Sequence, residues 1–600
     1  MTARGQRRAL GLLAGTLAVA AAVALTGRYA LRAEWWQVEH RVAAAPSVPL
    51  SDLGPSPGPL TVTWSRATPV HRGRLPGYSR VAYGLVHGQV VTVSGHGLDV
   101  RDARTGAARW SYRRSGWVLL GWAATGDRLA AYFEPDEGRD RRLMIGFDAR
   151  TGRRLWQREG DEPAALARAT LRWPAGSGVV VTTGGDRRTL RGRSAATGER
   201  LWRIPLRDGC VLSDSAAHAS AADETLVVVT LACPGEGREQ RHRLLAVDPG
   251  DGRVRWERPL GSSGPREVAV HGSVTLVSDD TTLYAYTRDG HRLLARHGED
   301  VCGDDVCPAA VAGDRLVVVW DHGRRIEAVE IPTGRTRWDR AAPGYLALTA
   351  AGGRVFGLRP RLAEGLLPAG VDAIDPGDGR TTTAATGLVV DPGLDGAVPW
   401  LAAAGGLLYV AAPQATPRPG GGARLAALHG GPSGRGTPEL GGVPVEDWPD
   451  ACSLLRPADL DATRLAGYRS RPGRVTIGHL TPEHPVSCAY EPGLSLYPED
   501  AGESVLPAAE ADPREVTVGV KWVAPDAASA SALLGALRDT QTQVRPRAGL
   551  GDEAYELGPT SGTIALRVGR HIIGVYASRP TGTATQVARA VAANLRTARP

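Results

Sequence analysis

The chain has 600 residues, more than the roughly 100 to 200 residues of a usual single domain, which excludes one small module. Hydrophobic residues make up 42% and charged residues 22%, as in globular proteins, and 76 Gly and 43 Pro indicate many turns. The net charge of +8 could indicate a nucleic-acid partner. Five of the 71 basic residues precede the first acid, Glu34, however, which leaves 66 basic against 63 acidic residues, and we expect no nucleic-acid partner.

A stretch of uncharged residues, 9–27, follows Arg4, Arg7 and Arg8 near the start of the chain. At about 1.5 Å per residue, a helix of this length approaches the roughly 30 Å of a bilayer's hydrocarbon core. The positive residues before it predict a cytoplasmic tail (1–8), a transmembrane signal anchor (9–27) and an extracytoplasmic chain beyond Arg28. A cleaved signal peptide is the alternative, and both interpretations predict export.

All six cysteines lie beyond this segment. Their clustering favours three local disulfides, which agrees with an oxidising compartment: Cys210 with Cys233, Cys302 with Cys307, and Cys452 with Cys488. A metal site is the alternative, but the sequence has no C-x-x-C and no His pair with zinc-finger spacing.

A repeat of about 45 residues covers most of the chain, and its clearest copies end in a Gly followed four residues later by Trp. These copies are 98–110, 144–156, 190–202, 244–256 and 326–338. Weaker copies without the final Trp lie at 283–294, at 371–383 and from 425 onward. With Trp64 opening the series, the chain contains seven full periods and an eighth partial one.

Each copy predicts a β-hairpin preceded by another pair of strands. In four copies an Asp whose side chain can bond the following amides begins the turn (Asp102, Asp148, Asp248 and Asp375), and the Gly that follows can take a positive φ without a Cβ clash. Apolar runs such as 90–93, 179–181, 227–229 and 317–319 precede the hairpins. Four short strands per repeat are typical of a propeller blade. The sequence therefore predicts a mainly β protein with an eight-bladed β-propeller over 60–430, its last blade completed by residues 60–64; seven blades are the alternative.

A small residue stands six positions before the turn Gly in most copies: Gly146, Gly192, Ala246, Ala328 and Ala373. This spacing resembles the tryptophan-docking motif of propellers of the pyrroloquinoline-quinone (PQQ) type, in which the Trp of one blade stacks against the small residue and the Gly peptide of its neighbours. The resemblance implies that blades dock through Trp64, Trp110, Trp156, Trp202, Trp256, Trp338, Gly106, Gly152, Gly198, Gly252 and Gly334.

The same family includes quinone-dependent alcohol and sugar dehydrogenases, so this activity is an alternative. The resemblance implies for such enzymes a Ca²⁺-binding set of carboxylates and amides, an Asp base and, in many, a disulfide between adjacent cysteines. This chain has no adjacent Cys pair, and Asp279, Asp280, Asp304 and Asp305 stand in turn-like stretches. No P-loop, H-E-x-x-H or G-x-S-x-G motif occurs. We therefore expect neither PQQ nor Ca²⁺ and predict no catalytic, cofactor-binding or metal-binding residue.

A stretch rich in Gly and Pro predicts a linker (431–446), after which the repeat ends. Beyond it, the periodicity of 447–600 predicts an α+β domain. Strands are expected at 474–478, near Cys488, and at 516–522, 564–568 and 572–576; helices are expected at 450–460, at 527–538 and around Val587, Val591 and Leu595. Residues 450–460, Cys488 and 549–555 resemble a small extracytoplasmic domain of actinobacterial lipoproteins and receptor-like ectodomains, a family of unknown biochemical function.

These features predict a single-pass protein of the cell membrane with a cytoplasmic N-terminus, in which a tether (28–59) joins the anchor to the propeller. We expect a non-catalytic scaffold at the cell envelope that senses a small ligand or binds an envelope protein. An envelope assembly factor and a quinone-dependent dehydrogenase are the alternatives.

Overall fold

The computed structural model describes residues 34–68, 83–136, 142–160, 178–184, 186–207, 209–213, 220–222, 225–235, 240–260, 264–265, 267–279, 281–302, 307–390, 399–414, 422–431, 435–463, 465–492, 515–541, 543–558, 562–578 and 581–597. The predicted tail and the apolar segment 9–27 lie outside these residues. Within them, none of the helices combines the length and the apolar character that crossing a membrane requires.

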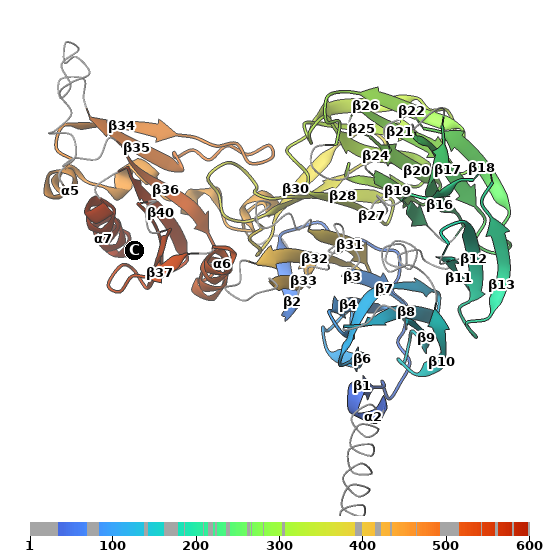
Figure 1. Ribbon diagram of the computed structural model, residues 1–600. Helices are drawn as coiled ribbons and strands as arrows, with labels where there is room; N and C mark the ends of the chain where they lie inside the picture. Colours follow the sequence, from blue (N-terminus) through green and yellow to red (C-terminus); the bar gives the residue numbers. More distant parts are fainter. Residues whose placement is uncertain are drawn as a thin grey trace, which may run out of the picture.

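The strands of the described chain form a ring of antiparallel sheets, with an α+β part beside it (Figure 1). We number the sheets as blades in chain order. Blade 1 contains β3 (Tyr83–Val86), β4 (Gln89–Ser94), β5 (Gly97–Asp102) and β6 (Ala108–Arg114), with β1 (Val38–Arg41) added on β6. Blade 2 contains β7 (Trp117–Thr125), β8 (Arg128–Pro135), β9 (Arg142–Asp148) and β10 (Arg154–Gly160). Blade 3 has three described strands, β11 (Val179–Thr183), β12 (Thr189–Ser194) and β13 (Arg200–Pro205).

The remaining blades follow the same order. Blade 4 contains β14 (Val211–Leu212), β15 (Ser220–Ala222), β16 (Val227–Pro234), β17 (Gln240–Val247) and β18 (Val254–Pro259). Blade 5 contains β19 (Glu267–His271), β20 (Val274–Ser278), β21 (Thr282–Thr287) and β22 (Arg292–His297). Blade 6 contains β23 (Ala309–Ala312), β24 (Arg315–Trp320), β25 (Arg325–Glu330) and β26 (Thr336–Ala341). Blade 7 contains β27 (Ala347–Ala351), β28 (Arg354–Arg359), β29 (Gly370–Ile374) and β30 (Thr381–Ala385).

Blade 8 closes the ring with strands from both ends of the propeller sequence. It contains β31 (Trp400–Ala404), β32 (Leu407–Gln414) and β33 (Gly422–Gly430), and β2 (Leu60–Thr68) pairs antiparallel with β33, so that Leu60 faces Gly430 and Thr68 faces Ala423. The prediction of an eight-bladed propeller of four-stranded blades is confirmed, and the seven-bladed alternative is wrong. Because β2 adds no new blade but completes the last one, both ends of the ring are fixed by the same ladder of hydrogen bonds.

The outer hairpin of each clear repeat has the local geometry that its residues favour. The Asp102 carboxylate accepts a hydrogen bond from the Arg104 amide at 3.0 Å, and Asp148 accepts one from the Arg150 amide at 2.9 Å. Four residues after each Asp, Gly106 has a φ of 68°. A side chain at this position would be strained in this left-handed conformation. The turn therefore has the conformation that its Asp and Gly predict, and the strand after it places Trp110 on the face of blade 1.

The described part of the tether lies against the propeller. It begins with α2 (Glu34–Gln37) and β1, and the Ala43 amide then donates to the Thr151 carbonyl at 2.8 Å. Farther along, the buried Gln89 amide donates to the Ser47 hydroxyl at 2.9 Å. The segment then passes the turn of blade 8 and reaches Phe356 of blade 7. Residues 34–59 thus connect blades 1, 2, 8 and 7.

The C-terminal part contains one seven-stranded sheet with helices packed against it. Its strands run in the order β34 (Tyr468–Gly473), β35 (Ser487–Pro492), β36 (Val516–Val523), β40 (His571–Ala577), β39 (Thr563–Val568), β38 (Glu553–Leu557) and β37 (Val544–Pro546). Its helices are η2 (Pro438–Leu440), η3 (Val445–Asp447), η4 (Ala451–Leu454), α5 (Pro457–Ala462), α6 (Ala527–Thr540) and α7 (Thr581–Thr597). The stripe of Val587, Val591 and Leu595 is buried, as its spacing predicts.

Two expectations for this domain are wrong. The strand expected at 474–478 is instead β34 at Tyr468–Gly473, where Cys488 of β35 faces Pro472. The period-two spacing of Val516, Val518, Val520 and Trp522 predicts that the four side chains share one face, but a bulge between Val520 and Trp522 ends the alternation. A bulge inserts one extra residue and reverses the alternation after it, which a period-two pattern does not reveal.

Three disulfides join the cysteines in the pairs that clustering favours: Cys210–Cys233, Cys302–Cys307 and Cys452–Cys488. The last closes a separation of 36 residues and links η4 to β35. In the chain-entropy account, a loop of this size contributes roughly 3 to 4 kcal/mol to stability by restricting the unfolded chain.

Candidate functional site

The junctions between blades are filled by the repeated indoles. In six of them, the Trp ring lies against the turn of the next blade, and its Nε1–H donates to a backbone carbonyl of that turn at 2.8 to 3.1 Å. The pairs are Trp64 with Ala103, Trp110 with Ala149, Trp156 with Ala195, Trp202 with Pro249, Trp256 with Arg288, and Trp338 with Pro376. A Cβ on Gly106 would lie 2.6 Å from Cδ2 of Trp64, so this approach requires glycine.

The turn glycines and the small residues meet different indoles. Gly106, Gly152, Gly198 and Gly252 each lie against the Trp of the preceding blade, and so do Gly290 and Gly379, which the predicted set of docking residues omits. The small residue instead faces the Trp of its own blade, since Ala246 pairs with Trp256 and Ala328 with Trp338. The resemblance had implied that both contacts were with neighbouring blades, and for the small residue that expectation is wrong.

At the junction between blades 5 and 6, no Trp occupies the docking position of the repeat. Leu294 takes the position of Trp, and Gly334 meets the carbonyl of Leu293 rather than a ring. Here the Arg296 guanidinium donates to both oxygens of the buried Glu327 carboxylate, Nε at 2.8 Å and Nη2 at 2.6 Å. A bidentate, charge-assisted pair thus joins β22 of blade 5 to β25 of blade 6.

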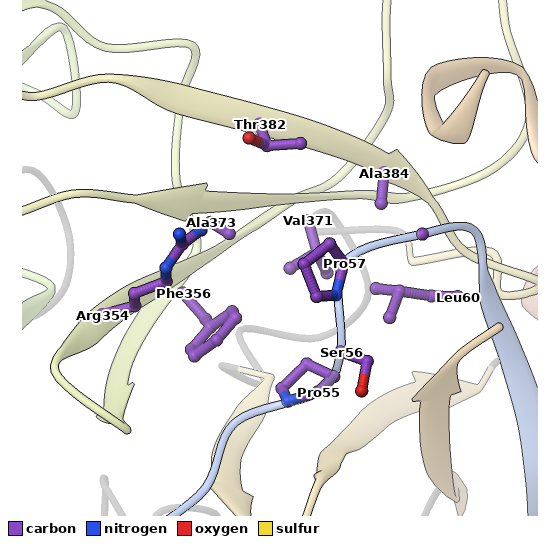
Figure 2. A pocket seen from close by; sticks show the side chains of 11 residues that line it. Pro55, Ser56, Pro57, Leu60, Arg354, Phe356, Val371, Ala373, Thr382 and Ala384 are labelled. Carbon is purple, nitrogen blue, oxygen red and sulfur yellow. The ribbon is translucent and has the colours of Figure 1, made fainter. Parts of the chain in front are cut away.

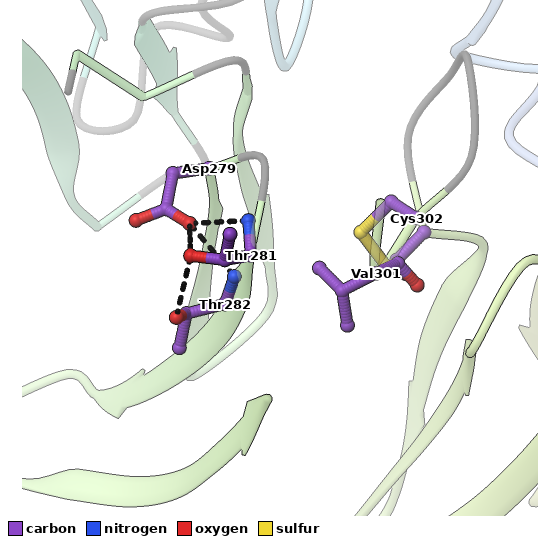
Figure 3. Close-up of a disulfide and its surroundings, with 6 residues drawn as sticks. Asp279, Thr281, Thr282, Val301 and Cys302 are labelled. Atoms are coloured by element: carbon purple, nitrogen blue, oxygen red, sulfur yellow. Dashed lines mark hydrogen bonds between the residues drawn. A yellow bond between two sulfur atoms is a disulfide. The ribbon is translucent and has the colours of Figure 1, made fainter. Parts of the chain in front are cut away.

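Of the four acidic residues considered for a quinone–Ca²⁺ site, Asp279 alone lies among the described residues. Asp279 accepts hydrogen bonds from the Thr281 and Thr282 amides at 2.9 and 2.7 Å, so its carboxylate closes a turn, away from Cys302 (Figure 3). Asp280, Asp304 and Asp305 lie outside the described residues. Where side chains are described, no three His, Cys, Asp or Glu residues are placed to hold a metal ion.

Blade 7 and the C-terminal domain share one hydrophobic core. Leu362 and Leu366, from the loop between β28 and β29, are buried with Trp448 and Trp522 of the C-terminal domain. The rings of Trp448 and Trp522 meet edge to face at 5.3 Å. In Figure 1 this domain, coloured orange to red, lies beside blades 7 and 8. The shared core makes the junction a fixed surface and not a flexible link.

A buried polar network positions the blade 7 loop in this junction. Asp372, 2% exposed, accepts hydrogen bonds from the Tyr345 hydroxyl at 2.6 Å and the Thr383 hydroxyl at 2.8 Å. The Arg359 guanidinium also reaches Asp372, at 3.5 Å, and donates to the Leu362 carbonyl. Because the loop begins at this arginine, the network anchors its first residues as far as Leu362.

Lys521, the only lysine in the chain, lies at this junction. It is the extra residue of the β36 bulge, and its carbonyl accepts a hydrogen bond from the Leu367 amide at 3.1 Å. Its side chain runs across the facing pair Gly519 and Gly574, where a Cβ at 574 would overlap Cε. Gly574 is therefore needed for the lysine to lie flat on the sheet, whereas a Cβ on Gly519 would lie 3.8 Å from Cε, an ordinary contact.

The ammonium group of Lys521 is half-buried and has no hydrogen-bond acceptor or carboxylate partner among the side chains and backbone groups that the structure describes. Burial, and to a lesser extent the nearby Arg361 guanidinium, lowers the pKa of Lys521 below its ordinary value. A cation without a partner in a fixed, partly desolvated site is suited to an anionic group. The sequence singles out Lys521 as the one lysine of the chain. Its partly buried position becomes apparent only from the bulge in β36 and the contact with the blade 7 loop.

The family model that matches this chain covers part of the tether and the first blades of the propeller. A PQQ-like repeat family model, described as outer membrane protein assembly factor BamB, matches residues 33–294. The crystal structure of BamB from Moraxella catarrhalis is 14% identical and covers 62% of this chain and 97% of its own, with a TM-score of 0.38. Quinohemoprotein alcohol dehydrogenase from Comamonas testosteroni is 14% identical and covers 70% and 82%, with a TM-score of 0.39. At these TM-scores neither likeness carries a functional argument. No curated protein sequence matches the chain.

The family match begins just before β1 and ends within blade 5, so it spans the first indole junctions. The remaining blades continue the same repeat to the closing pair of β2 and β33. With the family match, the repeated turn Gly and docked Trp identify the chain as a PQQ-like β-propeller repeat protein.

Proposed function

We propose that the chain is a non-catalytic interaction platform on the outer side of the cell membrane. Residues 9–27 anchor it with the N-terminus in the cytoplasm, and the propeller and the C-terminal domain bind an envelope partner without PQQ or Ca²⁺. The disulfides support an oxidising compartment, because such bonds rarely persist in the cytosol. The family match to an envelope assembly factor supports a partner that is a protein.

The Lys521 site carries this proposal. A half-buried ammonium beside Arg361, without a partner among the described residues, attracts a carboxylate or phosphate group. The shared core and the hydrogen bond from the Leu367 amide to the Lys521 carbonyl hold the blade 7 loop against the Lys521 backbone before binding, which reduces the entropy lost on association. The partner we propose is an acidic segment of an envelope protein that enters the junction with a carboxylate facing Lys521.

Acylation of Lys521 tests this site in the purified full chain. Because its pKa is lowered, we expect the rate at which an amine-reactive ester modifies Lys521 to level off at a lower pH than the rate for an exposed lysine in a reference peptide. An acidic peptide, succinate or inorganic phosphate should slow the modification severalfold, as measured by mass spectrometry of the 521 peptide. Failure of all three anions to protect the amine would overturn the proposed site.

Variants at position 521 separate binding from stability. Lys521→Arg keeps the charge and should retain binding of the acidic peptide, whereas Lys521→Met should lose it. The folded chain disfavours the ammonium form, so the unfolded chain binds more protons, and wild-type stability should rise as pH increases towards 10.5. Lys521→Met should lack this rise and be at least as stable near neutral pH. A Met variant that unfolds more easily at neutral pH would point to a structural role.

The proposal also predicts the outcome of an activity assay. PQQ and Ca²⁺ added to the purified full chain should give neither reduction of an artificial electron-acceptor dye with alcohols or sugars nor a shift in melting temperature. Dye reduction dependent on both additives would contradict a non-catalytic function.

A further inference from the structure

Blade 7 lacks the indole that other blades place against their neighbour. In blade 6, Trp338 faces Ala328 across the outer hairpin after a bulge. In blade 7, the equivalent small residue, Ala373, faces Thr382, and β29 and β30 pair without a bulge. The position opposite the small residue is therefore occupied by a short polar side chain.

The next blade also lacks the usual turn at this junction. The outer strand of blade 8 is β2, which arrives from the N-terminal side, so no hairpin joins it to β33. The segment Pro55–Gly58 lies there instead, and the Gly431 amide donates to the Pro59 carbonyl at 2.9 Å. Figure 2 shows Pro55, Ser56 and Pro57 facing Phe356 and Val371 of blade 7.

This replacement leaves a cavity of about 210 Å³ between blade 7 and the Pro55–Gly58 segment. Phe356, Val371 and Ala384 line its buried part, while Thr382 and Arg354 are exposed at its edge (Figure 2). A cavity of about 150 Å³ lined by apolar side chains can bind benzene, so this larger space is sufficient for a two-ring aromatic group. Among the residues that the structure describes, Arg354 has no carboxylate partner and can stack on an aromatic face.

We propose that this cavity is a binding site for a planar aromatic group of indole size. The fold itself shows that such a face holds an aromatic ring, because six other blade junctions each accept an indole from the chain. Blade 7 has the small residue Ala373 and the apolar side chains beside it, but it has Thr382 at the position where other blades have Trp. This site goes beyond the proposed function, since it depends neither on Lys521 nor on the membrane anchor.

Fluorine NMR with a fluorinated indole tests the site in the purified full chain. The probe should bind saturably to the wild-type protein. Thr382→Trp should place a ring of the chain in the cavity, abolish probe binding and raise the melting temperature. Leu201→Trp, which adds an indole to an exposed strand position of blade 3, should leave probe binding unchanged. Arg354→Ala should weaken binding about threefold through loss of stacking.

A second cavity-filling variant and a competition experiment test the same site independently. Ala384→Leu fills the cavity from its buried side and should also abolish binding, even if Thr382→Trp does not fold. A peptide with one exposed Trp should compete with the fluorinated indole if the natural ring is a protein side chain, whereas competition by free indole alone would identify a small molecule. The site is refuted if the wild-type chain does not bind the probe saturably, or if neither cavity-filling variant reduces binding.

Discussion

Replacing Trp110 with Ala should lower the free energy of unfolding by about 3–5 kcal/mol, the range for truncating a buried aromatic residue. Trp110 is 2% exposed, lies against Gly152 and stacks on Phe147 with ring centroids 5.9 Å apart. Its removal leaves a cavity between blades 1 and 2 and takes away one of the two donors to the Ala149 carbonyl, the other being the Gln89 side-chain amide at 2.7 Å. Chemical denaturation followed by circular dichroism measures the loss.

The matched control is Trp36→Ala, because Trp36 is 62% exposed. Surface substitutions of this kind usually change stability by less than about 0.5 kcal/mol. Equal losses for the two variants would contradict the structural role of the docked indoles. A large loss for Trp110→Ala alone supports their role in holding adjacent blades together.

The second large loss of stability is expected at the junction between blades 5 and 6, where an ion pair stands in place of the docked Trp. Glu327→Ala should lower the free energy of unfolding by about 3 kcal/mol or more, because it leaves the Arg296 guanidinium without its counter-ion in a largely buried site. Thermal and chemical denaturation measure the loss. The double variant Arg296→Met with Glu327→Met should recover part of it, since two apolar side chains leave no unpaired charge.

An exposed ion pair provides the control for Glu327. Arg380 and Asp378 form a pair whose side chains are 84% and 49% exposed, and exposed pairs contribute about 0–1 kcal/mol. Arg380→Ala should therefore have little effect. If Glu327→Ala lowers the free energy of unfolding as little as Arg380→Ala does, the Arg296–Glu327 pair does not take over the structural role of a docked Trp.

Much of the propeller could be predicted because its information is local and repeated. Asp, Gly and Trp at fixed spacing specify a hairpin within thirteen residues, as in 98–110, and β2 could be assigned to the last blade because Trp64 fits the same period. The weak copy 283–294 shows the limit. Its deletion displaced the turn glycine, and Gly290 was therefore missed although it docks on Trp256.

The candidate sites could not be predicted because they depend on contacts between distant segments. Lys521 is prominent in the sequence, but its setting requires the bulge in β36, Gly574 from β40 and the blade 7 loop. The Arg296–Glu327 pair joins two blades, and neither residue has a distinctive local pattern. The cavity at Thr382 arises from the route of Pro55–Gly58, and sequence alone indicates only a tether there.

Labelling in intact cells tests the central claim most directly. A membrane-impermeant amine-reactive reagent is applied to cells that express the full chain, and the 521 peptide is analysed by mass spectrometry, with Lys521→Arg as the unreactive control. An outward-facing platform with an accessible cation predicts modification of Lys521 in intact cells and its reduction by an added acidic peptide. Modification only after the cells are lysed would contradict both the orientation and the proposed function.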